Sequence, residues 1–170
     1  TEMAEDIIRI DDCPSPALVT IEVGGDGEEA TEEAIRGIYD SLRATSLAMS
    51  EKTVLPGGGA SHSMIAHHVR TEMESEPGRE RIAMESFARA METIPAVLAE
   101  NSGQNPLDKV LKLRSEARNG NCMGIDRDGK ITSPEGVWHP KSVISGSLET
   151  ATETAISMLR IDQVVSARGD

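Results

Sequence analysis

Aromatic residues are nearly absent from this 170-residue chain, which contains one Trp, one Tyr and one Phe. Aliphatic side chains, alanine and methionine must therefore fill the core, and this favours packed helices over a β-sandwich, which usually carries more aromatic residues. The two cysteines do not make a disulfide framework, so we expect a reducing compartment, the cytoplasm. Because no apolar run approaches the length of a membrane span, we expect neither a membrane-spanning segment nor a signal peptide.

Basic residues are also scarce: 17 Lys and Arg stand against 29 Asp and Glu, which gives a formal net charge of -12 at pH 7. A nucleic-acid partner needs a basic protein face to neutralise its phosphates, so this charge balance argues against DNA or RNA as a ligand. A chain of this length suits one domain or a piece of a larger one, and it can bury about 70% of its unfolded surface.

Hydrophobic periodicity predicts a mainly helical chain with short β segments near its start and one hairpin toward its end. We expect strands at 6–12 and 17–23, a hairpin at 122–131, and helices at about 28–51, 61–76, 78–101, 105–119 and 142–165. Apolar residues at helical spacing predict a buried face, formed in the first helix by Ile35, Ile38, Tyr39, Leu42 and Met49, and in the last by Leu148, Ala151, Ala155, Ile156 and Leu159. Pro95 should kink the third helix, because proline removes a backbone hydrogen-bond donor.

The most informative motif is a glycine triplet made of Gly57, Gly58 and Gly59. Three successive glycines remove every Cβ atom from a short loop, so another molecule can approach the bare backbone. The triplet lies between two expected helices, and Asp40 precedes it on the first of them. A bare loop between helices, with a carboxylate upstream, is a plausible way to hold a nucleotide, although a glycine triplet alone has low specificity.

Two interpretations of Asp40 follow from its position on the expected helix. It could be a general base that orients a water molecule for attack on a phosphate. The alternative is a solvated helix aspartate paired with Arg36 and Arg43, and the pattern by itself favours this second interpretation because surface pairs at such spacing are common.

Part of a calcium-loop pattern is present at residues 126–135, where a glycine, an isoleucine and a final glutamate fall at EF-hand spacing. However, Gly124 occupies the first ligand position and offers no carboxylate, and Pro134 lies where the exit helix should begin. A plain hairpin turn at Asp128-Gly129 is therefore favoured over a calcium site.

Three histidines, His62, His67 and His68, cluster after the glycine triplet. Their spacing does not place them cleanly on one helix face and no third ligand is evident, so surface histidines are favoured over a zinc site, and we expect no metal held by this chain alone. The terminal Arg168-Gly169-Asp170 spells an adhesion tripeptide, which we attribute to chance in an acidic chain expected in the cytoplasm.

Taken in order, these motifs resemble the C-terminal part of a group II chaperonin subunit of the thermosome type, and the resemblance covers nearly the whole chain. Val54-Leu55-Pro56-Gly57-Gly58-Gly59-Ala60 matches the family's Val-Val-Pro-Gly-Gly-Gly-Ala, and Asp40-Ser41-Leu42-Arg43 resembles its Asp-Ala-Leu-Arg segment at the same distance. Further matching segments lie at 17–25, 78–80, 94–95, 98–103, 105–108, 113–114, 124–126 and 158–162. So many motifs at matching spacing make the resemblance specific.

The resemblance implies an equatorial-type helical bundle with a small N-terminal pair of β-strands and a β-hairpin. Residues 1–52 would be an intermediate-domain-like segment, and residues 53–170 the C-terminal half of an equatorial-like domain. The implied cofactor is ATP with Mg, and Asp40 would be the catalytic carboxylate that activates water for hydrolysis. The implied nucleotide-binding residues are Gly57, Gly58, Gly59, Gly124, Ile125, Asp126 and His139, which would contact the base and the ribose.

Departures from the family pattern limit the implied activity. The family's N-terminal half carries the phosphate-binding loop and the metal-binding Asp, and this sequence contains neither. His139 stands where the family has an acidic residue that contacts the ribose, and His62 and Met64 stand where the family often has acidic residues. Phosphoryl transfer depends mostly on positioned charge and metal, so we expect little or no hydrolysis by this chain alone.

Two functions are therefore expected from the sequence. The first is a chaperonin-like fragment that carries part of the ATP site of an ATP-dependent protein-folding machine. The alternative is a stand-alone chaperonin-derived interaction or assembly module without ATPase activity, suggested by His139 and by the missing half. The expected partners are further copies of this chain or other chaperonin subunits, because apolar helix faces seldom stay in water, and unfolded protein clients only in a full-length context.

Overall fold

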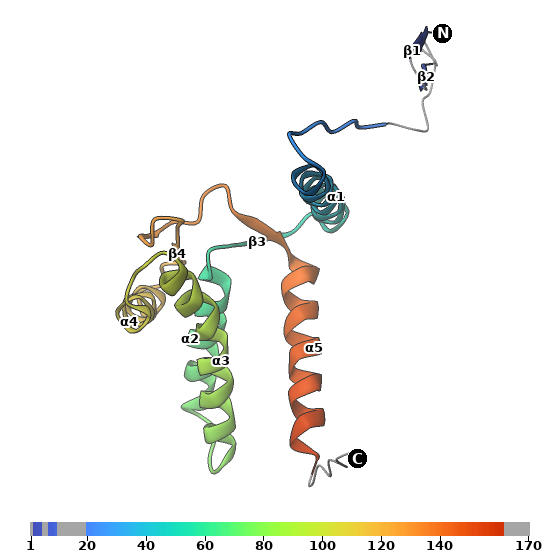
Figure 1. The fold of residues 1–170 in the computed structure, drawn as a ribbon. Helices are drawn as coiled ribbons and strands as arrows, with labels where there is room; N and C mark the ends of the chain where they lie inside the picture. Colours follow the sequence, from blue (N-terminus) through green and yellow to red (C-terminus); the bar gives the residue numbers. More distant parts are fainter. Residues whose placement is uncertain (1, 5–6, 10–19, 162–170) are drawn as a thin grey trace, which may run out of the picture. The chain divides into compact units, whose positions relative to one another are not determined.

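The computed structural model describes residues 2–4, 7–9 and 20–161, and these residues are mainly helical (Figure 1). The elements are β1 (Glu2–Ala4), β2 (Ile7–Arg9), α1 (Glu28–Glu51), β3 (Val54–Pro56), α2 (Ala60–Met73), α3 (Glu80–Asn101), α4 (Pro106–Arg118), β4 (Gly124–Ile125), β5 (Ile131–Thr132), β6 (Trp138–Pro140) and α5 (Lys141–Leu159). The expected mainly α fold class, with an N-terminal strand pair and a later hairpin, is confirmed. The chain divides into two compact units, 1–42 and 43–170.

The first unit contains the strand pair and most of α1. β1 and β2 pair antiparallel, with Met3 opposite Ile8. The expected strand at 6–12 is present as the shorter β2, but the expected strand at 17–23 is wrong at residues 20–23, which form none, while 17–19 lie outside the described residues. A segment rich in β-branched residues forms a strand only where a partner strand supplies hydrogen bonds. Here β1, rather than the expected strand at 17–23, pairs with β2.

Helix α1 has the predicted bounds but not the predicted buried face. None of its residues is buried, and the exposed fractions on the apolar stripe are Ile35 50%, Tyr39 55%, Leu42 55% and Met49 73%. An apolar stripe shows which face of a helix could be buried, but that face is buried only where a second surface covers it. The prediction that this stripe is buried within the chain is therefore wrong: α1 has an exposed apolar face.

The core of the second unit is made by α2, α3 and α4, which pack against one another. Four alanines on α2 and α3 have no exposed surface: Ala60, Ala66, Ala88 and Ala99. Small side chains at these contacts let the helices approach closely, so a core can form almost without aromatic residues. Around them lie two clusters, one completed by Met91 and the other by Leu113 and Ile125.

A cluster of charged residues around the buried Glu92, not anticipated from the sequence, joins these three helices. Glu92 on α3 is 6% exposed and accepts hydrogen bonds from Arg70 on α2 and from Arg114 on α4. Arg70 also donates to Glu85 at 2.9 Å. Burial alone would raise the pKa of Glu92, but the hydrogen bonds from Arg70 and Arg114 outweigh burial and hold this pKa below its ordinary value. The hydrogen bonds that Arg70 donates to Glu92 in turn raise the pKa of Arg70.

Helix α3 continues without a break through Pro95, whose side chain is fully buried. The proline therefore does not end the helix. Helix α4 begins as predicted, because the side chain of Asn105 accepts hydrogen bonds from the backbone N–H groups of Leu107 and Asp108. Among the residues that the structure describes, no helix is both long enough and apolar enough to cross a membrane.

Helix α5 ends at Leu159, earlier than predicted, and residues 162–165 of the expected helix lie outside the described residues. Its first turn is held by α1: the Glu51 carboxylate accepts the Ser142 backbone N–H at 3.0 Å, in the role of a helix cap. The expected apolar stripe of α5 is largely exposed. Within the stripe, Leu148 is half-buried against the Met91 cluster, whereas Ile156 is 42% and Leu159 84% exposed; the one buried residue of α5 is Ile144, outside the stripe.

Candidate functional site

The glycine loop, residues Gly57–Gly59, connects β3 to the start of α2. β3 pairs antiparallel with β6, and this pairing places Leu55 opposite His139. The backbone N–H of Gly57 donates to the Val137 carbonyl at 2.8 Å, and the backbone N–H of Ala60 donates to the Gly57 carbonyl at 3.0 Å. The loop is thus held by backbone hydrogen bonds at both ends.

Backbone geometry and close packing explain the three glycines. Gly58 and Gly59 have φ of 61° and 75°, in the left-handed region that other residues adopt at a cost. An added Cβ would lie 2.5 Å from the Val137 side chain at Gly57, 2.8 Å from the Ile125 carbonyl oxygen at Gly58, and 2.8 Å from Pro95 Cβ at Gly59. From the sequence we expected the missing side chains to let another molecule approach, but packing within this chain already requires glycine at all three positions.

The β4–β5 hairpin lies directly against the glycine loop. The backbone N–H of Ile125 donates to the Gly58 carbonyl at 2.8 Å. A Cβ at Gly124 would lie 3.0 Å from the Gly57 carbonyl and 2.9 Å from the Gly58 carbonyl, so this contact also depends on glycine. Residues more than sixty positions apart in the sequence therefore form one backbone surface.

The turn of this hairpin is built by Asp126. One of its carboxylate oxygens accepts the backbone N–H of Asp128 at 2.9 Å and that of Lys130 at 2.8 Å, and Gly129 supplies the positive φ of 75°. This is a plain turn held by an aspartate side chain. Across the described ranges, no group of three or more His, Cys, Asp or Glu side chains is arranged to hold a metal ion.

A cleft of about 840 Å³ opens beside the glycine loop. The loop and the hairpin residues Ile125 and Asp126 form one side, while α3 contributes Ile94 and Leu98. The segment leading into β6, including Val137 and His139, completes the lining. Its apolar walls carry a few polar groups, as is usual for a small-molecule site.

The structure brings most of the predicted nucleotide-binding residues to this one place. Gly57, Gly58, Gly59, Ile125, Asp126 and His139 line the cleft, and Gly124 is buried directly behind it against the glycine loop. Their role in binding stays a prediction, since proximity does not identify a ligand. Asp40 is exposed on α1 within the first unit, whereas the cleft belongs to the second, so its catalytic role also stays a prediction.

His62 is a further residue of the cleft that sequence reasoning assigned to the surface. It lies in the first turn of α2, is half-buried and lines the cleft together with His139. Burial lowers the pKa of His62, and so does the positive charge of His139 when that residue is protonated. The β3–β6 pairing that brings His139 here was missed as well, because strands of three residues show no readable alternation.

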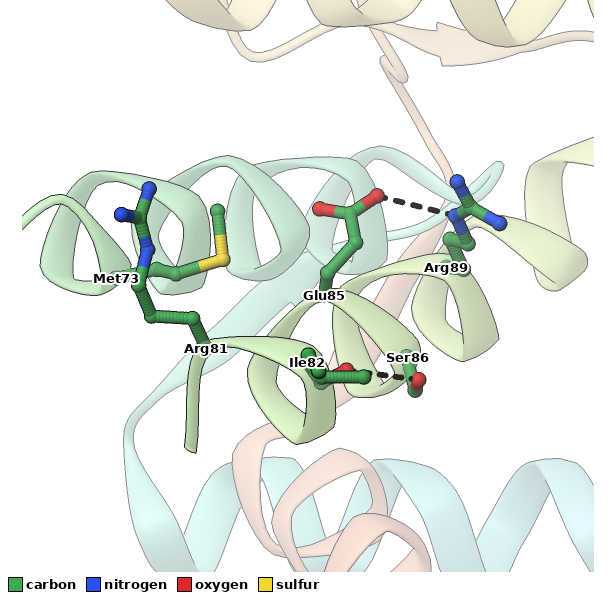
Figure 2. Close-up of a pocket in the computed structure, with 6 residues that line it drawn as sticks. All are labelled: Met73, Arg81, Ile82, Glu85, Ser86 and Arg89. Carbon is green, nitrogen blue, oxygen red and sulfur yellow. Dashed lines mark hydrogen bonds and ion pairs between the residues drawn. The ribbon is translucent and has the colours of Figure 1, made fainter. Parts of the chain in front are cut away.

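A second hollow, of about 370 Å³, lies on α2 and α3 and contains none of the predicted site residues. Figure 2 shows Met73 and Ile82 as its apolar residues, together with Glu85, which forms an ion pair with the exposed Arg89 at 3.1 Å. The Glu85 carboxylate also binds Arg70, so its hydrogen-bonding capacity is used within the protein.

Comparison with known proteins places this geometry in a family. The sequence pattern of the TCP-1/cpn60 chaperonin family matches residues 2–169. The chain is 37% identical over 166 residues to a thermosome subunit of Methanocaldococcus jannaschii, covering 95% of this chain and 31% of that protein. It is 40% identical over 160 residues to the thermosome subunit beta of Thermoplasma acidophilum, covering 92% of this chain and 30% of that protein.

A solved structure agrees with the sequence relatives. The open-state monomer of a group II chaperonin from Methanococcoides burtonii superposes with a TM-score of 0.69 and 28% sequence identity, over 81% of this chain and 35% of that chain. The present chain thus spans about a third of the length of the relatives it matches. With a family match over nearly its full length and relatives above 30% identity, the chain belongs to the TCP-1/cpn60 chaperonin family.

Proposed function

We propose that this chain carries the nucleoside-binding wall of a chaperonin ATP site. Residues 1–52 would correspond to an intermediate-domain-like segment and residues 53–170 to the C-terminal half of an equatorial-like domain. The single observation that supports this proposal most is the meeting of the glycine loop, the β4–β5 hairpin and His139 around one cleft.

The residues present fit a nucleoside better than a triphosphate. The cleft offers apolar surface at Ile94, Leu98 and Val137 for a purine, and backbone groups of the glycine loop for close approach. Its charged lining residues are Asp126, Arg127 and Glu135. Two carboxylates against one guanidinium do not suit a triphosphate with its metal, which needs several donors and cations.

The roles of individual residues follow from this fit. Gly57, Gly58 and Gly59 would position the base and ribose against the backbone, Ile125 and Asp126 would border the base, and His139 would face the ribose. Mg-bound phosphates would lie toward groups supplied by a further part of the assembly, where Asp40 would orient the attacking water. We therefore expect weak nucleotide binding and no turnover by this chain alone.

Isothermal titration of the chain with ATP and Mg tests the binding. A matched pair of variants on α3 provides the control: Ile94→Trp fills the cleft, whereas the neighbouring exposed Thr93→Trp points elsewhere. We expect the first substitution to lower the affinity at least tenfold and the second to leave it unchanged. Equal affinity in all three proteins would show that ATP does not use this cleft.

Hydrolysis is tested separately by measuring phosphate release with and without Mg. We expect no Mg-dependent turnover from wild type. Robust turnover that Asp40→Ala abolishes would show that the remaining half of the site is not needed and that the partial-site proposal is wrong.

The exposed apolar faces of α1 and α5 support a proposal about partners. Tyr39 and Leu42 on α1, and Leu159 on α5, are more than half exposed. We infer that they pack against another chaperonin polypeptide or a second copy of this chain, because contiguous apolar surface seldom stays in water. Light scattering should show concentration-dependent association, and a strict monomer at every concentration would contradict this.

A further inference from the structure

Two histidines from distant parts of the second unit lie at one end of the cleft. His62 comes from the first turn of α2 and His139 from β6, and each side chain is half-buried. A Cβ atom placed on Gly57 would lie 3.2 Å from His139 Nε2, so this imidazole stands directly against the glycine loop. The other described histidines behave differently: neither His67 nor His68 lines the cleft, and exposed His68 lies 3.9 Å from Glu72.

The charges around these two imidazoles come from the hairpin and from the loop before β6. Asp126 and Arg127 line the cleft from the hairpin, and Glu135 lines it from the loop. Helix α3 presents only neutral side chains to the cleft, and Ser102, directly after the helix, is neutral as well. Together these two acids and one base carry a net formal charge of -1, and their charges stay fixed while imidazoles titrate. The charge at this end of the cleft therefore changes mainly when the two histidines gain or lose protons.

We propose that His62 and His139 form one titrating pair that decides whether this end of the cleft accepts a hydroxyl-bearing ligand or an oxyanion. When both imidazoles are neutral, each has one ring nitrogen that can accept a hydrogen bond from a ligand hydroxyl. A protonated imidazole has two donors and a positive charge, so it loses that acceptor and favours a phosphate- or sulfate-like group.

The pair should charge in two steps, because each proton disfavours the next. Burial and the neighbouring His139 both lower the pKa of His62, so His62 gains its proton at a lower pH than an ordinary histidine. The proposal uses the cleft of the proposed function but does not require that ATP be its ligand.

The coupling is tested by NMR titration of the imidazole resonances in the whole chain, which needs no ligand. His139→Gln should raise the titration midpoint of His62, because it removes the positive charge of the protonated partner. His67→Gln is the control, because His67 lies on the same helix without lining the cleft, and it should leave that midpoint unchanged. An unchanged His62 midpoint in His139→Gln would overturn the pair.

Ligand selection is tested with inorganic sulfate, whose charge stays constant over this pH range. Sulfate affinity should rise at least tenfold from pH 7.5 to pH 5 in wild type and should not rise in the His62→Gln/His139→Gln double variant. An equal rise in both proteins would place the anion elsewhere and refute the selection. If ATP failed to bind at pH 7.5 while the His62 midpoint still responded to His139→Gln, the proposed nucleotide function would be wrong and the histidine pair would stand.

Discussion

Replacing Gly58 by alanine should destabilise the second unit through two separable effects. Its φ of 61° costs a residue with a Cβ about 1–2 kcal/mol. The new Cβ would also lie 2.8 Å from the Ile125 carbonyl oxygen, a backbone atom that cannot rotate away. Overpacking of this kind costs about 1–3 kcal/mol, and the reduced freedom of the unfolded chain returns about 0.4–1 kcal/mol. We expect the free energy of unfolding to fall by about 2–4 kcal/mol.

Gly103→Ala is the matched control, because Gly103 has a similar φ of 72° and nothing within 4 Å of its added Cβ. It should lose only about 0.5–1 kcal/mol, so the difference between the two variants measures the contact with Ile125. Urea unfolding at fixed protein concentration, followed by circular dichroism, gives both values. The fluorescence of Trp138, which pairs with Pro56 beside the loop, reports the local change. Equal destabilisation of the two variants would refute the packing argument.

Three further predictions concern the helices of the second unit. Glu92→Gln should lower the free energy of unfolding by about 3 kcal/mol, because it leaves Arg70 and Arg114 without their buried carboxylate. Thermal unfolding measures this loss, and the control Glu100→Gln, at an exposed position of the same helix, should have almost no effect. Because the pKa of Glu92 is lower in the folded protein than its ordinary 4.5, its contribution is complete above about pH 4.5 and is lost as the pH falls through the lowered value. Unfolding curves of wild type and Glu92→Gln should therefore converge at acidic pH, and a constant gap down to pH 2 would contradict the linkage. Asn105→Ala should cost about 1 kcal/mol, measured by urea unfolding, because two backbone donors at the start of α4 lose their acceptor; no loss would show that water replaces the cap.

Local signals in the sequence were sufficient for much of the fold. The bounds of α1, the Asn105 cap and the Asp128-Gly129 turn were all predicted correctly, because each depends on neighbours within a few residues. The same local signals failed where burial was concerned. The apolar residues of α1 do lie on one helix face, but whether that face is buried depends on a second surface, which the local sequence does not reveal.

The candidate site divides in the same way. Its glycine triplet was found as a motif, and Gly124 and Asp126 were implied by the resemblance to a chaperonin subunit, which agrees with the family match. His62 was missed as a residue of the cleft, since nothing in its immediate sequence indicates that β6 returns to the start of α2. The Arg70–Glu92–Arg114 cluster was missed for a similar reason, because its members are 22 residues apart in each pair.

The sequence by itself determined the helices, the turns, the glycine loop and the family, because these depend on residue type and short spacing. Only the tertiary structure decided that the glycines pack against Val137, Ile125 and Pro95, and that two histidines share one cleft. Those contacts join segments separated by tens of residues, and their existence depends on how α2, α3 and the β3–β6 pair fit together in space.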